Sequence, residues 1–207
     1  ICEQIEDPRE AKKRGAKSVV RREVVRVVTP GTVTDDGLLD AARPSYLAAL
    51  SAGAGELGLA WVEVSTGAFF VQNLPAAALA AALARIEPAE MILPRPLLER
   101  PELFEALALV KDRLTPEPEA RFALAPARER LILGFGLATA EGLSAGEIAA
   151  AGALLEYLER TQAGRMPRLS APRRLPPPGA QGAAMEIDAA TRRNLELARA
   201  LSGERAG

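Results

Sequence analysis

One acidic side chain in the sequence has the setting of a metal-dependent active site. Glu63 ends an alternating apolar run and is followed at once by the turn residues Ser65-Thr66-Gly67. A nuclease that uses two magnesium ions about 4 Å apart needs three or four converging carboxylates to hold them. Glu90 stands at the entrance of a short apolar segment and Glu147 fits a helix cap, so neither supplies the missing ligands. We therefore predict that Glu63 is an ordinary strand residue, and we keep a metal-dependent nuclease centred on Glu63 as the alternative.

The composition excludes several other chemistries. The 207 residues contain no histidine and one cysteine, Cys2. Without histidine, the chain lacks the commonest general base, most zinc sites and every Ser-His or Cys-His nucleophile. One cysteine forms neither an internal disulfide nor a thiolate metal cluster, which fits a reducing compartment and predicts a cytoplasmic protein. The chain has no Walker-type phosphate-binding loop, and no apolar run approaches the ~20 residues of a membrane span.

Two stretches of the chain are strongly basic, although the whole chain has a net charge of only −1. Residues 9–26 hold eight Lys or Arg against two Glu, a local charge of +6, and residues 160–174 hold five Arg and no acid. Such clusters can bind nucleic-acid phosphates. The candidate phosphate contacts are Lys12, Lys13, Arg14 and Lys17. Neither stretch contains an aromatic residue on which a base could stack, so we predict a solvated surface and keep a phosphate-binding DNA module as the alternative.

The first half of the chain contains two clear strand signals. The valines of residues 19–28 favour a strand, because branched side chains suit a pleated sheet. Pro30 and Gly31 then predict a tight turn in which Gly31 takes a positive φ. Further on, alternation on both sides of a Ser-Thr-Gly turn predicts a hairpin of residues 57–64 and 68–72.

Helices and further strands are predicted around this hairpin. Ser144 and Glu147 form a capping box ahead of apolar residues at three-and-four spacing, which predicts a helix to about Gln162. The other predicted elements are a strand or helix start at 44–51, helices at 75–86, 96–110 and 127–133, strands at 91–93 and near 121–124, and a final helix after Asp188. Together they predict a mixed α/β fold, an open sheet with helices packed on it.

Four segments follow one another in a characteristic order: ICEQIEDP, REVVRVVTPGTVTDDGLLD, GLAWVEVSTGAFF and MEIDAATRRNLEL. In order and spacing they resemble the MutS family of DNA mismatch repair proteins. The resemblance implies that the chain is a piece of a longer protein. The implied parts are the tail of the mismatch-binding domain with a basic linker (1–16), an RNase H-like connector domain without nuclease activity (17–165), a Pro/Arg-rich linker (166–184) and the start of the helical core or lever domain (185–207).

The same resemblance implies a function. The chain would be a non-catalytic connector module that couples mismatch recognition to ATP-driven rearrangement. A MutL-like protein would bind its surface, and the resemblance implies that Glu129 and Arg130 on the short helix face that partner. The module itself would hold no catalytic residue, metal or cofactor. Other domains of the same chain would bind ATP, Mg²⁺ and mismatched duplex DNA.

Overall fold

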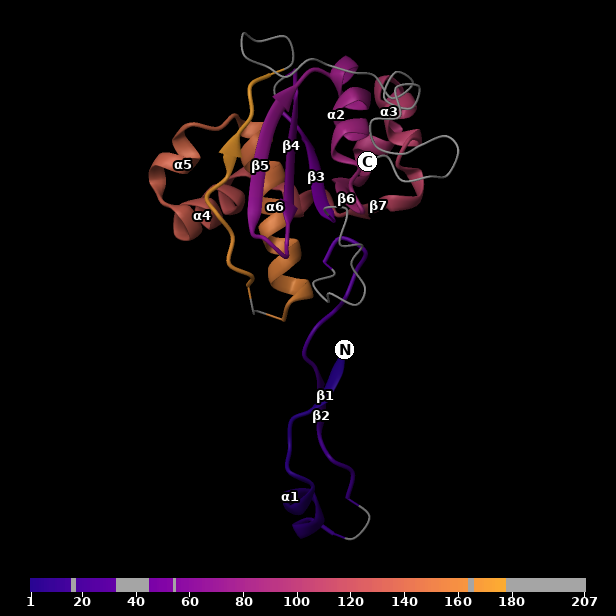
Figure 1. Cartoon of the computed structure of the whole chain (residues 1–207), viewed down its shortest axis with the longest axis vertical. Helices are drawn as coiled ribbons and strands as arrows, with labels where there is room; N and C mark the ends of the chain where they lie inside the picture. Colours follow the sequence, from indigo (N-terminus) through magenta and orange to yellow (C-terminus); the bar gives the residue numbers. More distant parts are fainter. Residues whose placement is uncertain (16–17, 33–44, 54, 164–165, 178–207) are drawn as a thin grey trace, which may run out of the picture.

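The computed structural model describes residues 1–15, 18–32, 45–53, 55–163 and 166–177. These residues form a sheet domain and a slender N-terminal extension, which projects from the lower end of the sheet in Figure 1. The final helix predicted after Asp188 lies outside the described residues, and so does Lys17.

A six-stranded mixed sheet forms the centre of the domain. Its strands are β3 (Tyr46–Ala52), β4 (Leu57–Glu63), β5 (Ala68–Leu74), β6 (Glu90–Pro94), β7 (Leu114–Glu117) and β8 (Arg173–Arg174). The spatial order is β7-β6-β3-β4-β5-β8. Strands β3, β4 and β5 form an antiparallel meander, β6 and β7 are added in parallel on the β3 side, and β8 runs parallel to β5. The predicted hairpin is thereby confirmed, and its Gly67 has a φ of 76° in the turn.

Helices cover both faces of the sheet (Figure 1). One face carries α4 (Leu124–Phe135), α5 (Leu137–Glu141) and α6 (Ala145–Thr161), and the other carries α2 (Leu79–Ile86) and α3 (Phe104–Ala108). Short 3₁₀ turns are η1 (Ala76–Ala78), η2 (Arg95–Glu99), η3 (Pro101–Leu103), η4 (Lys111–Arg113) and η5 (Glu119–Phe122). Because successive strand residues point to opposite faces, Leu47 packs in the core under α6 and Ala48 in the core under α2.

Helix α6 lies directly against the sheet because small residues meet at the contact. It begins with the predicted capping box, in which the Ser144 hydroxyl accepts from the Glu147 N–H and the Glu147 carboxylate accepts from the Ser144 N–H. Gly146 lies against Gly58 of β4, where an added Cβ on Gly58 would be 1.9 Å from the Gly146 carbonyl carbon. On the outer side of α6, a Cβ on Gly152 would be 2.3 Å from the Ala127 Cβ of α4. Helix α6 is therefore packed closely against the backbone of β4 on one side and against that of α4 on the other.

The N-terminal extension is a small unit of its own. Strand β1 (Cys2–Gln4) pairs with β2 (Arg22–Val24) in an antiparallel two-stranded sheet, and α1 (Pro8–Lys13) lies between them in the chain. Helix α1 starts at Asp7, whose carboxylate accepts from the Arg9 N–H at 2.8 Å. The strand predicted over residues 19–28 is shorter than expected: only residues 22–24 pair, and all three are exposed. Branched side chains favour an extended backbone over residues 19–28, but the paired residues 22–24 are exposed and no helix or second sheet of the described part of the chain covers them.

Three other predicted elements differ from the observed ones, and proline explains the first difference. The helix predicted over 96–110 is divided into η2, η3 and α3, because Pro96 and Pro101 each begin a new turn. A strand occurs at Leu114–Glu117 and not near residues 121–124, which lie in and after η5. That strand, β7, tolerates Pro116 because it lies at the edge of the sheet. The short helix predicted at 127–133 is longer, over Leu124–Phe135.

Candidate functional site

Glu63, the candidate centre of a nuclease site, closes the β4–β5 hairpin. Its carboxylate accepts a hydrogen bond from the Thr66 hydroxyl at 2.8 Å, and its backbone C=O accepts from the Gly67 N–H. Across the sheet it lies opposite Tyr46 of β3 and Ala68 of β5. Within the described part of the chain, no group of three or more His, Cys, Asp or Glu could hold a metal ion. That Glu63 is an ordinary strand residue, and the nuclease alternative, both stay predictions.

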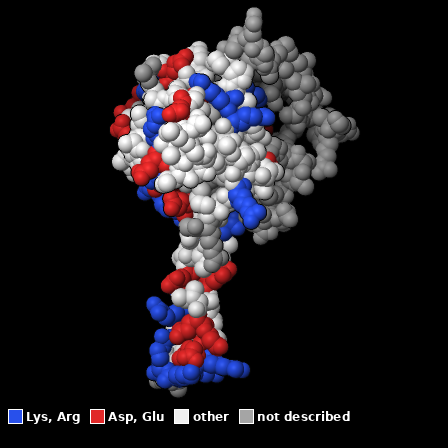
Figure 2. Space-filling view, turned by 90° about the vertical axis from the view of Figure 1, so that its left-hand side faces the viewer, with Lys and Arg blue, Asp and Glu red and all other residues white. Residues whose placement is uncertain are grey.

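Of the candidate phosphate contacts, Lys12 and Lys13 lie on α1 and Arg14 follows its last residue, at the tip of the extension (Figure 1). Lys13 forms an ion pair with Glu10 and Arg14 forms one with Glu6, with N–O distances of 2.5 and 2.7 Å. A hydrogen bond from the Arg21 N–H, followed by the charge of Arg14, lowers the pKa of the Glu6 carboxyl. Figure 2 shows acidic and basic side chains side by side at this tip. Neighbouring carboxylates therefore offset part of the local positive charge that the sequence indicates.

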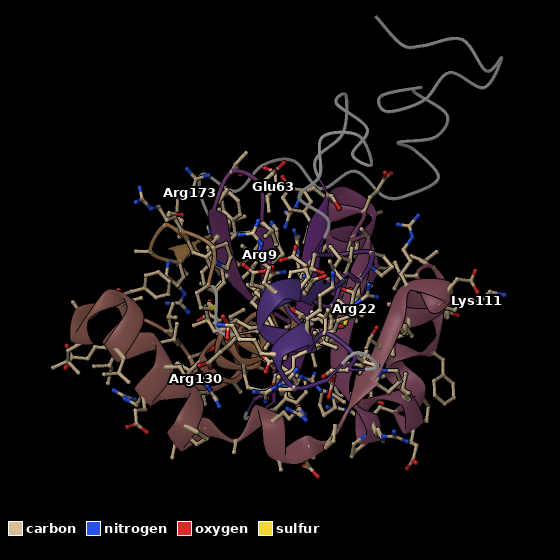
Figure 3. All side chains as sticks on the ribbon, turned by 90° about the horizontal axis from the view of Figure 1, so that it is seen from below. Arg9, Arg22, Glu63, Lys111, Arg130 and Arg173 are labelled. Carbon is tan, nitrogen blue, oxygen red and sulfur yellow. The ribbon has the colours of Figure 1, made fainter. Side chains whose placement is uncertain are left out.

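Three arginines of the second basic stretch make contacts within the sheet domain. The Arg174 guanidinium donates to the buried Glu147 carboxylate at 2.9 Å and to the Gly142 C=O at 3.1 Å. The Arg160 guanidinium lies 2.5 Å from the Glu117 carboxylate. The Arg173 guanidinium sits 5.0 Å from the centre of the Phe70 ring (Figure 3). Glu147 thus both caps α6 and anchors β8, a second role that the capping motif does not reveal.

A surface groove runs between α4, α6 and the segment after α6. Its volume is about 480 Å³. The lining residues are Arg130, Leu133, Gly134, Phe135, Leu155, Glu159, Met166, Pro167 and Leu169. Of the predicted partner-facing pair, Arg130 is half-buried and lines the groove, whereas Glu129 is exposed and does not line it. Leu133 beside Arg130 is 80% exposed, so the groove has an apolar rim.

A buried contact that the sequence does not reveal joins the extension to the sheet domain. The Gly31 N–H donates to Glu90 Oε2 at 3.1 Å, while Glu90 Oε1 accepts from the Thr115 hydroxyl at 2.9 Å and from the Tyr157 hydroxyl at 2.6 Å. We call these four residues the Glu90 clasp. Burial, followed by the hydrogen bond to Glu90, raises the pKa of the Tyr157 phenol well above its ordinary value. A second contact, from the Val27 N–H to the Thr161 C=O at 2.7 Å, lies beside the clasp on the end of α6.

The turn that enters the clasp is the one predicted at Pro30 and Gly31, but its glycine serves another purpose. The φ of Gly31 is not in the left-handed region, so the predicted positive φ is wrong. A Cβ at Gly31 would instead be 2.8 Å from Leu47 Cδ1 and 2.9 Å from Glu90 Cβ. Glycine is required because the turn presses against the sheet domain. The turn motif was the one sequence signal that could have located this contact.

Fold and surfaces together describe a mixed-sheet domain that is joined to a second unit through a buried turn and carries an apolar groove. Residues 45–170 match the family model for MutS domain II, and residues 1–37 match the model for MutS domain I. The chain belongs to the MutS family. The Thr29–Thr32 turn lies within the domain I match, yet Glu90, which holds it, lies within the domain II match. The predicted boundary between residues 16 and 17 stays a prediction.

Curated relatives agree with this assignment over the whole chain. The chain is 50% identical over 210 residues to the DNA mismatch repair protein MutS of Paracoccus denitrificans. It is 49% identical over 215 residues to that of Nitrobacter winogradskyi and 45% identical over 216 residues to that of Azorhizobium caulinodans. All of this chain aligns in each case, and it covers 23%, 24% and 23% of the relatives' lengths, about a quarter. Among the described residues, no helix is long and apolar enough to cross a membrane.

Proposed function

We propose that this chain is the connector module of a MutS-type mismatch repair ATPase and carries no catalytic site of its own. Its parts would be the mismatch-binding tail and basic linker (1–16), the connector (17–165), a linker (166–184) and the start of the helical core or lever domain (185–207). An RNase H-like fold for the connector is supported by the strand order, in which two parallel strands extend an antiparallel meander. Other domains of the longer protein would bind mismatched duplex DNA, ATP and Mg²⁺.

One observation carries the coupling role: the last two turns of α6 face two surfaces at once. Tyr157 donates to Glu90, which in turn accepts from the Gly31 N–H of the incoming turn. Four residues further on, the Thr161 C=O accepts from the Val27 N–H of the segment that enters from the extension. Leu155 and Glu159, also four residues apart, line the groove. Residues four apart share one side of a helix, so one rigid helix presents one side to the N-terminal unit and another to the groove. A movement of the N-terminal unit would reach the groove through α6.

The groove is the proposed site for a MutL-like partner. Its apolar rim is formed by Leu133, and Leu137 on α5 is exposed as well. Arg130 and Glu159 in the lining add one positive and one negative charge to this apolar surface. An apolar centre with a few charges suits a protein partner, because burying the leucines provides affinity and the charges set orientation. Glu129 would lie at the edge of the contact.

The test uses the full-length protein with a MutL-like N-terminal domain, crosslinked in the presence of ATP and mismatched DNA. Leu133→Asp should abolish the crosslink, and Arg130→Glu should reduce it, while mismatch binding stays normal. Lys111→Glu is the matched control, because Lys111 is exposed on η4 and lies on the other side of the domain from Arg130 in Figure 3. Crosslinking that is equal in all three variants and the wild type would remove the groove from the proposal.

A further inference from the structure

The contact between the N-terminal extension and the sheet domain includes one buried carboxylate. Glu90 is only 3% exposed. A buried carboxylate is costly unless hydrogen bonds satisfy its oxygens. Here the two oxygens have different partners: Oε1 accepts from Thr115 and Tyr157 of the sheet domain, and Oε2 accepts from the Gly31 N–H of the incoming turn. Glu90 is therefore held by the domain at one oxygen and holds the turn with the other.

The turn is built to present that N–H. The Thr32 hydroxyl accepts from the Thr29 N–H at 2.9 Å, and the Thr32 N–H donates to the Thr29 C=O at 2.9 Å, so the turn is closed on itself. The Arg26 guanidinium donates to the Thr32 C=O at 2.8 Å and ties the turn back to the extension. Thr32 is fully buried although it is polar. The turn is thus bonded to Arg26 of the extension and to Glu90 of the sheet domain, so it fixes the direction in which the extension leaves the domain.

We propose that Glu90 is a positioning residue that locks the Thr29–Thr32 turn onto the sheet domain and thereby fixes the direction of the N-terminal extension. The Glu90–Gly31 hydrogen bond spans 59 positions of sequence and joins the two family matches. With this bond open, the Val27–Thr161 hydrogen bond still ties the extension to α6, so the direction of the extension is less tightly fixed while the sheet domain stays folded. The proposal adds a fixed point to the connector role proposed above, and it does not depend on whether a partner occupies the groove.

The chemistry of the clasp provides a variant that weakens the Gly31 bond in either orientation of the new amide. In Glu90→Gln, an amide whose oxygen replaces Oε1 turns its NH₂ toward the Gly31 N–H, and two donors cannot bond to each other. With the amide reversed, its NH₂ donates to the Thr115 and Tyr157 hydroxyls, and a neutral oxygen replaces the carboxylate as the acceptor for Gly31, which is a weaker bond. Gly31→Ala reaches the same end by another route, because its Cβ cannot fit beside Leu47 and Glu90. Tyr157→Phe is the matched control, since it removes one donor from Oε1 and leaves the Gly31 bond in place.

The experiment is hydrogen–deuterium exchange on the full-length protein. In Glu90→Gln and Gly31→Ala, amides in residues 26–32 should exchange at least ~10-fold faster, as expected when a bond to a charged group is lost. Amides in β4 and α6 should keep their wild-type rates, and Tyr157→Phe should change the turn less than Glu90→Gln does. Dyes on unnatural residues at positions 12 and 111 report the angle of the extension, and their energy-transfer distribution should broaden in the first two variants.

Two results would overturn the proposal. If the turn exchanges at the wild-type rate in both Glu90→Gln and Gly31→Ala, the bond does not hold it. If exchange rises equally in the turn, β4 and α6, Glu90 only stabilises the core and does not position the extension. Leu133→Asp separates this proposal from the partner proposal: it should leave the turn and the dye distribution unchanged even where it abolishes crosslinking.

Discussion

The close contact between Gly58 of β4 and Gly146 of α6 predicts that adding one methyl group, in Gly58→Ala, displaces α6 and destabilises the domain. In Gly58→Ala, the new Cβ would lie 1.9 Å from the Gly146 carbonyl carbon, 2.1 Å from its oxygen and 2.3 Å from the Glu147 nitrogen. All three are backbone atoms of α6, so no side chain can turn aside to make room. An ordinary contact begins at 3.4 Å, and 3.4 minus 1.9 leaves a shift of about 1.5 Å for the helix.

The cost of that shift follows from what α6 touches. Overpacking a core costs about 1–3 kcal/mol when side chains can adjust. Here the whole helix must move, and it is held on its other side by the Gly152–Ala127 contact. We therefore expect a loss of about 3 kcal/mol, the upper end of that range. In hydrogen exchange of the full-length protein, this corresponds to a rise of about 100-fold in the slowest β3, β4 and α6 amides.

The control substitution is Gly134→Ala. Gly134 lies in α4, and a Cβ there has nothing within 4 Å. Alanine is favoured over glycine by about 0.5–1 kcal/mol in a helix interior. Gly134 is the second-last residue of α4, so the gain should be smaller there and α4 should exchange at the wild-type rate or slightly more slowly. If Gly58→Ala instead exchanges within about twofold of wild type, α6 is not seated on β4 as described, and the coupling through its last two turns loses its basis.

Three further predictions concern titration, metal chemistry and salt. Burial and the bond to Glu90 raise the pKa of the Tyr157 phenol above its ordinary value of 10.0, so the stability that depends on the neutral phenol is fully present below pH 10 and is lost as the pH rises through the raised pKa. Denaturant unfolding at increasing pH should show this loss of unfolding free energy. In Tyr157→Phe, the unfolding free energy should fall less steeply with pH. Glu63→Ala should leave DNA cleavage in Mg²⁺ or Mn²⁺ unchanged, and cleavage abolished by this substitution would restore the nuclease alternative. If Lys12 and Lys13 contact phosphate, Lys12→Glu and Lys13→Glu should each reduce the magnitude of the slope of log K against log[salt] for DNA binding by about 0.9. We predict a solvated surface, so we expect this slope to stay unchanged in both variants.

Local patterns in the sequence were enough to predict several elements. The hairpin was predicted from alternation around Ser65-Thr66-Gly67, and α6 from its capping box and apolar spacing. These signals succeed because the interactions that produce them span only a few residues. The same reasoning misplaced β7 and treated residues 19–28 as a strand of the domain. Proline and branched residues restrict the local backbone conformation, but they do not determine which other segment of the chain pairs with that backbone.

The sequence by itself also determined the family, through four short segments, and its composition excluded histidine chemistry, an internal disulfide and a thiolate metal cluster within these 207 residues. Only the tertiary structure decided where the surfaces lie. It separated Arg130, in the groove, from Glu129, outside it, and brought Glu90 to Gly31. Glu90 has no local signal, because its partners come from three distant parts of the chain. The structural role of a buried carboxylate such as Glu90 can be assigned only when the fold shows which donors form hydrogen bonds with its oxygens.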